Sequence, residues 1–261
     1  VPSTSFKDFL SMLPSVYRKD FASIETNGHI NFNGFIKGKY DRKHFPSYHA
    51  NLYVTSAYFK YPDLPLPVEN INFACQVNNP DGIPDHLTVK IANAHAEISK
   101  DTLDLHLLMK NLETRPFIDF GLAGNLDLAN ISNWMKLDSG TRLTGLLKAD
   151  IYAKGNIPGS GKQKKSLFQS GGKFSLAGFS YLSKGRPRGI TLDELLLDFK
   201  PENVLIRELK GTYCSTQVDA TGAINNLFAF ALGDKPLNGS IDLKAGELNL
   251  REWINATADP S

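Results

Sequence analysis

Apolar and polar residues alternate along several segments of this chain. In residues 103–110 the odd positions are all apolar, and three of the four even positions are polar. A period of two is typical of a β-strand that has one dry face and one wet face. Comparable patterns predict further strands in residues 30–36, 124–128, 147–153, 218–224 and 239–243. The residues expected on the dry face are Ile30, Phe32, Leu103, Leu105, Leu107, Met109, Leu126, Leu128, Leu147, Ile151, Val218, Ala220, Ile224, Ile241 and Leu243.

Turn signals between these segments favour antiparallel hairpins. Asn27-Gly28 and Asn238-Gly239 are dipeptides whose residues adopt positive φ at little cost. Helix signals are sparse, because few segments carry apolar residues at the spacing of a helix. Short helical turns are expected only after Ser5, Asn130 and Asn249 and within residues 227–232.

The same pattern passes twice along the chain. Gly28 and Gly38 bracket one strand-like segment, and Gly145 and Gly155 bracket another of the same length, 145 − 28 = 117 residues later. Repeated units that cannot bury their apolar faces alone stack on their neighbours. Later anchors keep similar offsets: Asn111-Leu112 corresponds to Asn226-Leu227, residues 124–128 to 239–243, and Asn130 with Trp134 to Asn249 with Trp253.

The repeat therefore predicts an all-β, mainly antiparallel fold with a few short helices. We expect two tandem β modules, residues 1–129 and 130–248, that form a curved, groove-like elongated sheet. Residues 249–261 would then be the start of a third boundary element. Since this element stands near both ends of the chain, we expect an internal section of a longer protein.

Composition and charge narrow the possible functions. The chain is 41% hydrophobic and 21% charged, and its formal net charge of 29 − 27 = +2 is too small for a dedicated nucleic-acid binder. No stretch approaches the roughly 18 apolar residues of a membrane span, and residues 1–4 do not resemble the start of a signal peptide. Cys75 and Cys214 occupy non-equivalent places in the two modules, so whether they pair stays open.

Catalytic and metal-binding motifs are weak. Residues 159–162 depart from a phosphate-binding loop, because Asn156 stands where that loop needs glycine and Gln163 where it needs serine or threonine. Among the six histidines only His44 and His49 are near neighbours, and no cysteine is close to them. The sequence therefore predicts no enzyme, no metal site and no other cofactor.

Charged features that recur in both modules indicate surface roles. Asp127 and Asp242 stand at equivalent positions, which favours a role in turns or in the sheet over catalysis. The loops Lys39–His49 and Asn156–Gly172 are both basic and also equivalent. Either their lysines face solvent or they meet anionic lipid headgroups, and both readings stay open.

The segment from Thr221 to Trp253 resembles the C-terminal repeat regions of the AsmA family. In it a strand ends in an Asn-Leu turn, a short apolar run leads to a Gly-x-Ile-x-Leu strand, and Leu-x-Leu closes into the boundary element. Residues 125–134 repeat the last part, and the likeness spans essentially the whole chain as two modules. The resemblance implies a long curved sheet whose concave apolar face is a groove for phospholipid acyl chains. It carries over no catalytic residue and no cofactor.

The resemblance also implies a cellular setting. AsmA-like proteins are typically anchored by an N-terminal helix in the inner membrane of Gram-negative bacteria, and their bodies lie in the periplasm. This chain would be a periplasmic section that supports phospholipid transport between the inner and outer membranes and outer-membrane assembly. The expected partners are phospholipid or another apolar lipid, the rest of its own chain and other envelope proteins, but no nucleic acid.

Alternatives to a lipid groove stay open. The alternating leucines could fill the core of a closed β-sandwich instead of lining a groove. The repeat surface could be a structural scaffold that binds another envelope protein, for example by strand addition at an exposed sheet edge. A secreted glycan-active enzyme is a more distant third reading.

Overall fold

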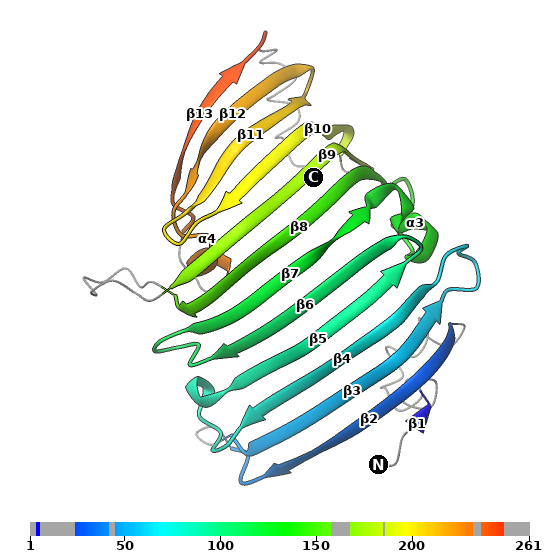
Figure 1. The fold of residues 1–261 in the computed structure, drawn as a ribbon, viewed down its shortest axis with the longest axis vertical. Helices are drawn as coiled ribbons and strands as arrows, with labels where there is room; N and C mark the ends of the chain where they lie inside the picture. The colour runs from blue at the N-terminus through cyan, green and yellow to red at the C-terminus, as the bar shows by residue number, and fades with distance from the viewer. Residues whose placement is uncertain are drawn as a thin grey trace. The chain divides into compact units, whose positions relative to one another are not determined.

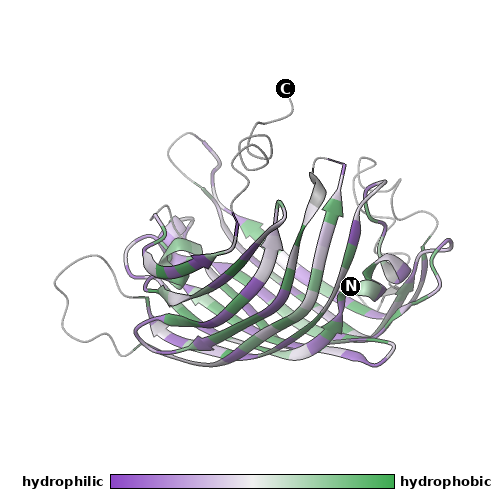
Figure 2. Cartoon of the chain, turned by 90° about the horizontal axis from the view of Figure 1, so that it is seen from above, coloured by the Kyte–Doolittle hydropathy of each residue, from purple (hydrophilic) through white to green (hydrophobic). Residues whose placement is uncertain are grey.

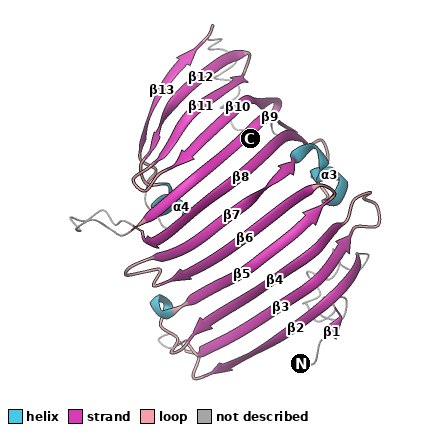
Figure 3. Cartoon of the chain, in the orientation of Figure 1, coloured by secondary structure: helices cyan, strands magenta, loops and turns pink. Residues whose placement is uncertain are grey.

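The fold is a single antiparallel meander. The computed structural model describes residues 4–5, 24–41, 45–157, 168–184, 186–231 and 236–247. Thirteen strands, β1 to β13, form one unclosed sheet whose spatial order is the order along the chain (Figure 1). In the residues that the structure describes, helix is limited to a few short turns (Figure 3). The all-β prediction is confirmed, and the closed sandwich is excluded because the described residues contain no second sheet.

The chain divides into two compact units. Unit 1 comprises Val1–Gly124 and Tyr152–Gln169, and unit 2 comprises Asn125–Ile151 and Ser170–Ser261. The module boundaries predicted after residues 129 and 248 were drawn from the sequence repeat, whereas these units are defined by their contacts. The two divisions are therefore not the same, and the module boundaries stay a prediction.

Unit 1 is built from long strands joined by short connections. Between β5 and β6 the chain turns at Ser99 and Lys100, and Ser99 adopts a φ of 58°. One 3-10 turn, η1 (Pro84–His86), lies between β4 and β5. The strands are β1 (Thr4–Ser5), β2 (Glu25–Lys37), β3 (Ser47–Lys60), β4 (Val68–Asn79), β5 (Thr88–Ile98), β6 (Asp101–Lys110) and the first part of β7 (Phe117–Asp127).

β-Bulges bend the strands of unit 1. The pairing register shifts once or twice in each of the pairs from β2–β3 to β5–β6, and these shifts lie at facing positions of neighbouring strands. The side chain of Asn72 completes one bulge, because it accepts a hydrogen bond from the Ser56 amide at 2.8 Å and donates to the Asn70 carbonyl at 2.8 Å. Bulges increase twist and bend a strand. The strands accordingly curve along their length (Figure 2).

Unit 2 repeats this construction. Register shifts occur in the β10–β11 and β11–β12 pairs. Its strands are the first part of β8 (Arg142–Asn156), then β9 (Gln169–Ser183), β10 (Arg186–Phe199), β11 (Val204–Tyr213), β12 (Thr216–Ile224) and β13 (Gly239–Ala245). Its helical turns are η2 (Leu128–Asn130), α3 (Ile131–Trp134) and α4 (Leu227–Ala231).

Two of the expected helical turns are present. α3 follows Asn130, and α4 lies within residues 227–232, as the sequence predicted. Asp127 begins η2, since its carboxylate accepts a hydrogen bond from the Ala129 amide at 3.0 Å. This contact confirms the turn role expected for Asp127. The helical turns predicted after Ser5 and at Asn249 lie outside the described residues.

The sequence repeat extends to backbone conformation. Gly28 and Gly38 adopt φ values of 115° and 131°, and their counterparts Gly145 and Gly155 adopt 130° and 127°. Glycine alone reaches such values at little cost. The four positions therefore require glycine for the same reason, in and directly after β2 and within β8.

Candidate functional site

Pairing registers gather the apolar side chains of unit 1 on one side of its sheet. Ile30 lies opposite Val54, and Leu107 lies opposite Ile91. Because alternate residues of a strand point to opposite faces, the registers define a single apolar face. We call it apolar face 1: Ile30, Phe32, Leu52, Val54, Phe73, Cys75, Val77, Val89, Ile91, Ala94, Ala96, Leu103, Leu105, Leu107 and Met109.

Apolar face 1 is closed at one place and open elsewhere. Ile30, Val54 and Ala57 are at most 3% exposed and form a small core at the bend of β2 and β3. Leu103 is 39% exposed, whereas Leu105, Leu107 and Met109 are half-buried. The face therefore offers partly exposed apolar surface over β4, β5 and β6.

Unit 2 carries an equivalent face. One row of directly paired residues crosses five strands, from Leu176 through Leu195, Leu209 and Ala220 to Leu243. A second row of paired residues runs beside it across the same five strands, at the next position on the same face of each strand. We call the two rows apolar face 2, together with Val218 and Ile224, which alternate with them in β12, with Leu147 of the same core and with Ile151, which alternates with Leu147 in β8: Leu147, Ile151, Phe174, Leu176, Leu195, Leu197, Ile206, Leu209, Val218, Ala220, Ile224, Ile241 and Leu243.

A short helix covers part of apolar face 2. Leu128 of η2 and Ile131 of α3 pack on Leu176 in a core that also contains Leu126 and Leu147. Leu128 is 7% exposed and Ala220 is 3% exposed, so these two candidates offer little surface to a ligand. Toward β13 the face opens, because Ile241 is 60% exposed and Leu243 is 57% exposed.

Sequence reasoning missed part of both faces. In β5 the apolar face is formed by odd-numbered residues up to Ile91 and by even-numbered residues from Ala94 onward. The change occurs at a register shift, where Asn93 adopts a φ of 51°. Strict period-two reading fails across such a bulge. In β9 the short alternation of Phe174 and Leu176 around Ser175 was a usable signal, whereas the continuous run of leucines at 195–197 in β10 does not tell one face from the other.

The opposite side of the unit 1 sheet carries polar side chains that bond to one another between neighbouring strands. The side-chain amide of Asn51 donates to the side-chain oxygen of Asn33 at 2.8 Å and to Nε2 of His49 at 2.8 Å. His49 then carries its proton on Nδ1, which lies 3.2 Å from the side-chain oxygen of Asn78. On the same side Asp119 lies 2.7 Å from the Lys154 ammonium. These polar groups bond to one another across strands, as expected of a solvated sheet face.

His95 bridges two carboxylates on this polar side. Its Nδ1 lies 2.7 Å from Asp104 and its Nε2 lies 3.0 Å from Glu97, which also accepts a hydrogen bond from the side-chain amide of Asn70 at 2.9 Å. The hydrogen bonds to Glu97 and Asp104 raise the pKa of His95, and the bond from His95 lowers the pKa of Glu97. Both ring nitrogens can donate only in the imidazolium form. The triad is therefore a cross-strand clamp that requires a charged histidine.

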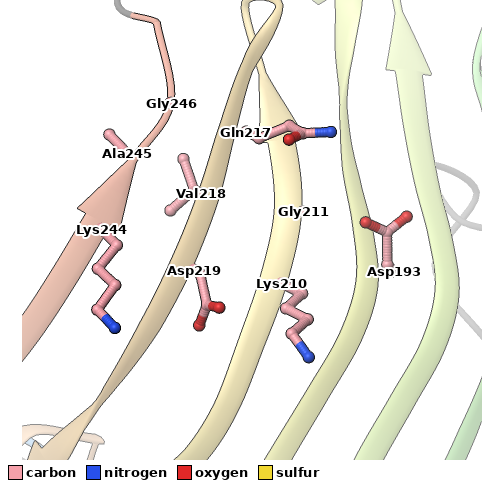
Figure 4. Close-up of a pocket in the computed structure, with 9 residues that line it drawn as sticks. All are labelled: Asp193, Lys210, Gly211, Gln217, Val218, Asp219, Lys244, Ala245 and Gly246. Carbon is pink, nitrogen blue, oxygen red and sulfur yellow. The ribbon is translucent and has the colours of Figure 1, made fainter.

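Two ion pairs stand out among the described charged groups of unit 2. Arg207 lies 2.7 Å from Asp198 and lowers the pKa of that carboxyl, and Glu208 raises the pKa of Lys210 through their ion pair. A shallow hollow of about 410 Å³ between β11, β12 and β13 is lined by acidic and basic side chains together (Figure 4). This mixture suits a solvated sheet better than recognition of one charged ligand.

The described residues hold little further chemistry. They contain no group of three or more histidine, cysteine or acidic residues placed to bind a metal. Cys75 and Cys214 are free thiols, half-buried and buried respectively. Among the helices that the structure describes, none has the length and hydropathy to cross a membrane. The loop of residues 159–162 lies outside the described residues.

Comparison with known proteins adds no further information. No family model, no curated protein and no solved structure matches this chain.

Proposed function

We propose that apolar faces 1 and 2 bind the acyl chains of phospholipid, and that the protein is a non-enzymatic, AsmA-like section of the cell envelope that takes part in lipid transport. The observation that carries the proposal is the incomplete cover of both faces. Leu103, Ile241 and Leu243 are between 39% and 60% exposed, and the residues opposite them on the described neighbouring strands are Ala96, Gly222 and Ala220. Sheets normally bury such a face under a helix or a second sheet.

Acyl chains fit this surface for physical reasons. Apolar surface removed from water gains about 25 cal/mol per Å², and a flexible hydrocarbon chain adapts to a bent trough without directional contacts. Neighbouring strands lie about 4.8 Å apart, so a chain laid across β4, β5 and β6 would touch several rows of side chains. The polar side of the sheet stays hydrated, which suits a periplasmic location.

A scaffold is the second candidate, and one observation favours it. All seven residues of β13 are exposed, and β13 is the last strand in the sheet order of the described residues. A free strand edge can pair with a strand of another protein. In that case Ile241 and Leu243 would contact a protein partner rather than lipid.

Site-specific photo-crosslinking tests the lipid proposal. Benzoylphenylalanine at position 105 or 243 should capture phospholipid in cells, when the residue stands in the natural full-length protein. The same group at position 104 or 242 should not, because Asp104 and Asp242 alternate with the apolar positions and face the other side. Loss of the contrast between neighbouring positions would refute the proposal, and capture of a protein at 243 would favour the scaffold.

Charge substitution gives a second test. Leu105→Asp should remove lipid from apolar face 1 and so lower the lipid occupancy of the protein, since an unpaired carboxylate in an apolar trough costs on the order of several kcal/mol. Asp104→Leu on the polar side should leave occupancy unchanged. Occupancy is read by mass spectrometry of lipid retained after gentle purification, and circular dichroism checks that both variants fold. A folded Leu105→Asp variant with normal lipid content would contradict the proposal.

A further inference from the structure

One corner of unit 1 gathers exposed apolar side chains around two lysines. Ile36 and Tyr40 are 77% and 78% exposed, more than any other large apolar side chain that the structure describes. Phe35, Phe45 and Ile83 are also about half exposed. We define the β2–β3 corner as Phe35, Ile36, Lys37, Lys39, Tyr40, Phe45 and Ile83.

The corner is held together by defined contacts. The rings of Tyr40 and Phe45 meet edge to face with centroids 5.7 Å apart. Gly82 adopts a φ of 81° and leaves no room for a Cβ beside the Phe45 carbonyl, which brings Ile83 next to the β2–β3 connection. At the base of this connection the Ser47 hydroxyl donates to the Lys37 carbonyl at 2.9 Å. These contacts position the described apolar side chains on both sides of the connection.

The corner adjoins apolar face 1. β1 pairs only with His29 and Ile30, so residues 31–37 of β2 have no strand on their outer side in the described part of the chain. Phe32, which belongs to apolar face 1 and is 42% exposed, lies on this stretch. Ile36 pairs with Tyr48 on the same side of the sheet as Phe32. The apolar surface thus continues from face 1 to the corner.

The seven residues of the corner include two lysines and no acidic side chain. Lys37 and Lys39 are exposed, and neither has an ion-pair partner among the described residues. Asp81, which lines the same hollow, is held by His86 at 2.6 Å, and this bond lowers the pKa of Asp81. Residues 37–49 contain four lysines and arginines and one acidic residue.

We propose that the β2–β3 corner docks on an anionic phospholipid membrane, with its aromatic and aliphatic side chains in the interface and its two lysines on headgroup phosphates. Aromatic rings with flanking lysines are the composition that membrane–water interfaces favour. A hydrophobic protein partner would not require the unpaired cations. This docking goes beyond the proposed function and does not depend on it, because it needs no lipid in either apolar face.

Vesicle co-sedimentation tests the docking. The chain should bind phosphatidylglycerol vesicles at low salt, bind phosphatidylcholine vesicles much more weakly, and lose affinity as salt rises. Replacing both lysines (K37Q/K39Q) should lower the partition coefficient about thirtyfold. Replacing the two most exposed apolar residues (I36S/Y40S) should lower it by about tenfold or more.

Matched variants away from the corner provide controls. L146S/Y152S removes two β8 side chains that are 53% and 51% exposed, and K90Q/K148Q removes two exposed lysines; both should bind as the unchanged chain does. Equal loss in corner and control variants would overturn the docking proposal, and so would absent vesicle binding at low salt, which would leave the corner to a protein partner. Failure of lipid capture at position 105 together with normal vesicle binding would refute the groove and leave the docking intact.

Discussion

At the residue scale, His95 is the clearest electrostatic feature. Its raised pKa means that the charged form is stabilised by folding, so its contribution to stability is complete below its ordinary pKa of about 6.5 and is lost as the pH rises through the raised value. His95→Gln should therefore lower the melting temperature at about pH 6 and leave it unchanged at about pH 9. Glu97 remains ionised at pH 6, because its own pKa is lowered.

Proton NMR provides the direct measurement for His95. Its ring should titrate above the ordinary range, and Asp104→Asn should move that titration downward, since the bond to Asp104 is one of its causes. A titration that Asp104→Asn leaves in place would contradict the clamp. No sequence pattern pointed to this triad, because Asp104 and His95 meet only through the pairing of β5 with β6.

At the element scale, Gly28 shows how a bent strand depends on one missing side chain. A Cβ at Gly28 would lie 2.5 Å from the Cα of Ala57, and the φ of 115° is itself costly for any other residue. Gly28→Ala should destabilise the protein by about 2–4 kcal/mol in urea unfolding. Gly178→Ala is the matched control: Gly178 also has positive φ, 59°, but nothing lies within 4 Å of its would-be Cβ, so only about 1 kcal/mol should be lost. Equal losses of unfolding free energy in the two variants would contradict the idea that the close contact between Gly28 and Ala57 requires glycine.

The strands themselves were predictable, while their bends were not. Alternation in residues 103–110 predicted β6 and its apolar side, and paired glycines predicted equivalent strands β2 and β8. Bulges depend on which residues of a neighbouring strand lie opposite, so the shift at Asn93 could not be inferred from β5 alone. The open or closed character of the apolar face likewise follows from strand order, which a single segment does not encode.

At the scale of the whole molecule, each unit is a single layer in the described residues, with an apolar face that lacks full cover. A soluble protein seldom leaves so much contiguous apolar surface in water. Protein stripped of lipid should therefore bind the dye anilinonaphthalene sulfonate strongly and self-associate in sedimentation velocity runs. Added lysophospholipid should displace the dye and restore the smaller species, because occupied faces no longer gain from contact with each other.

The dye experiment also discriminates between the two candidate functions. Leu105→Asp should reduce dye binding, since it places a charge within apolar face 1, whereas Asp104→Leu should not. A scaffold that uses the β13 edge would also bind the dye through its exposed apolar faces, but lysophospholipid would not reverse an association made by strand pairing. Weak dye binding by a folded, lipid-free chain would mean that the apolar faces are covered from within, and the lipid proposal would fail.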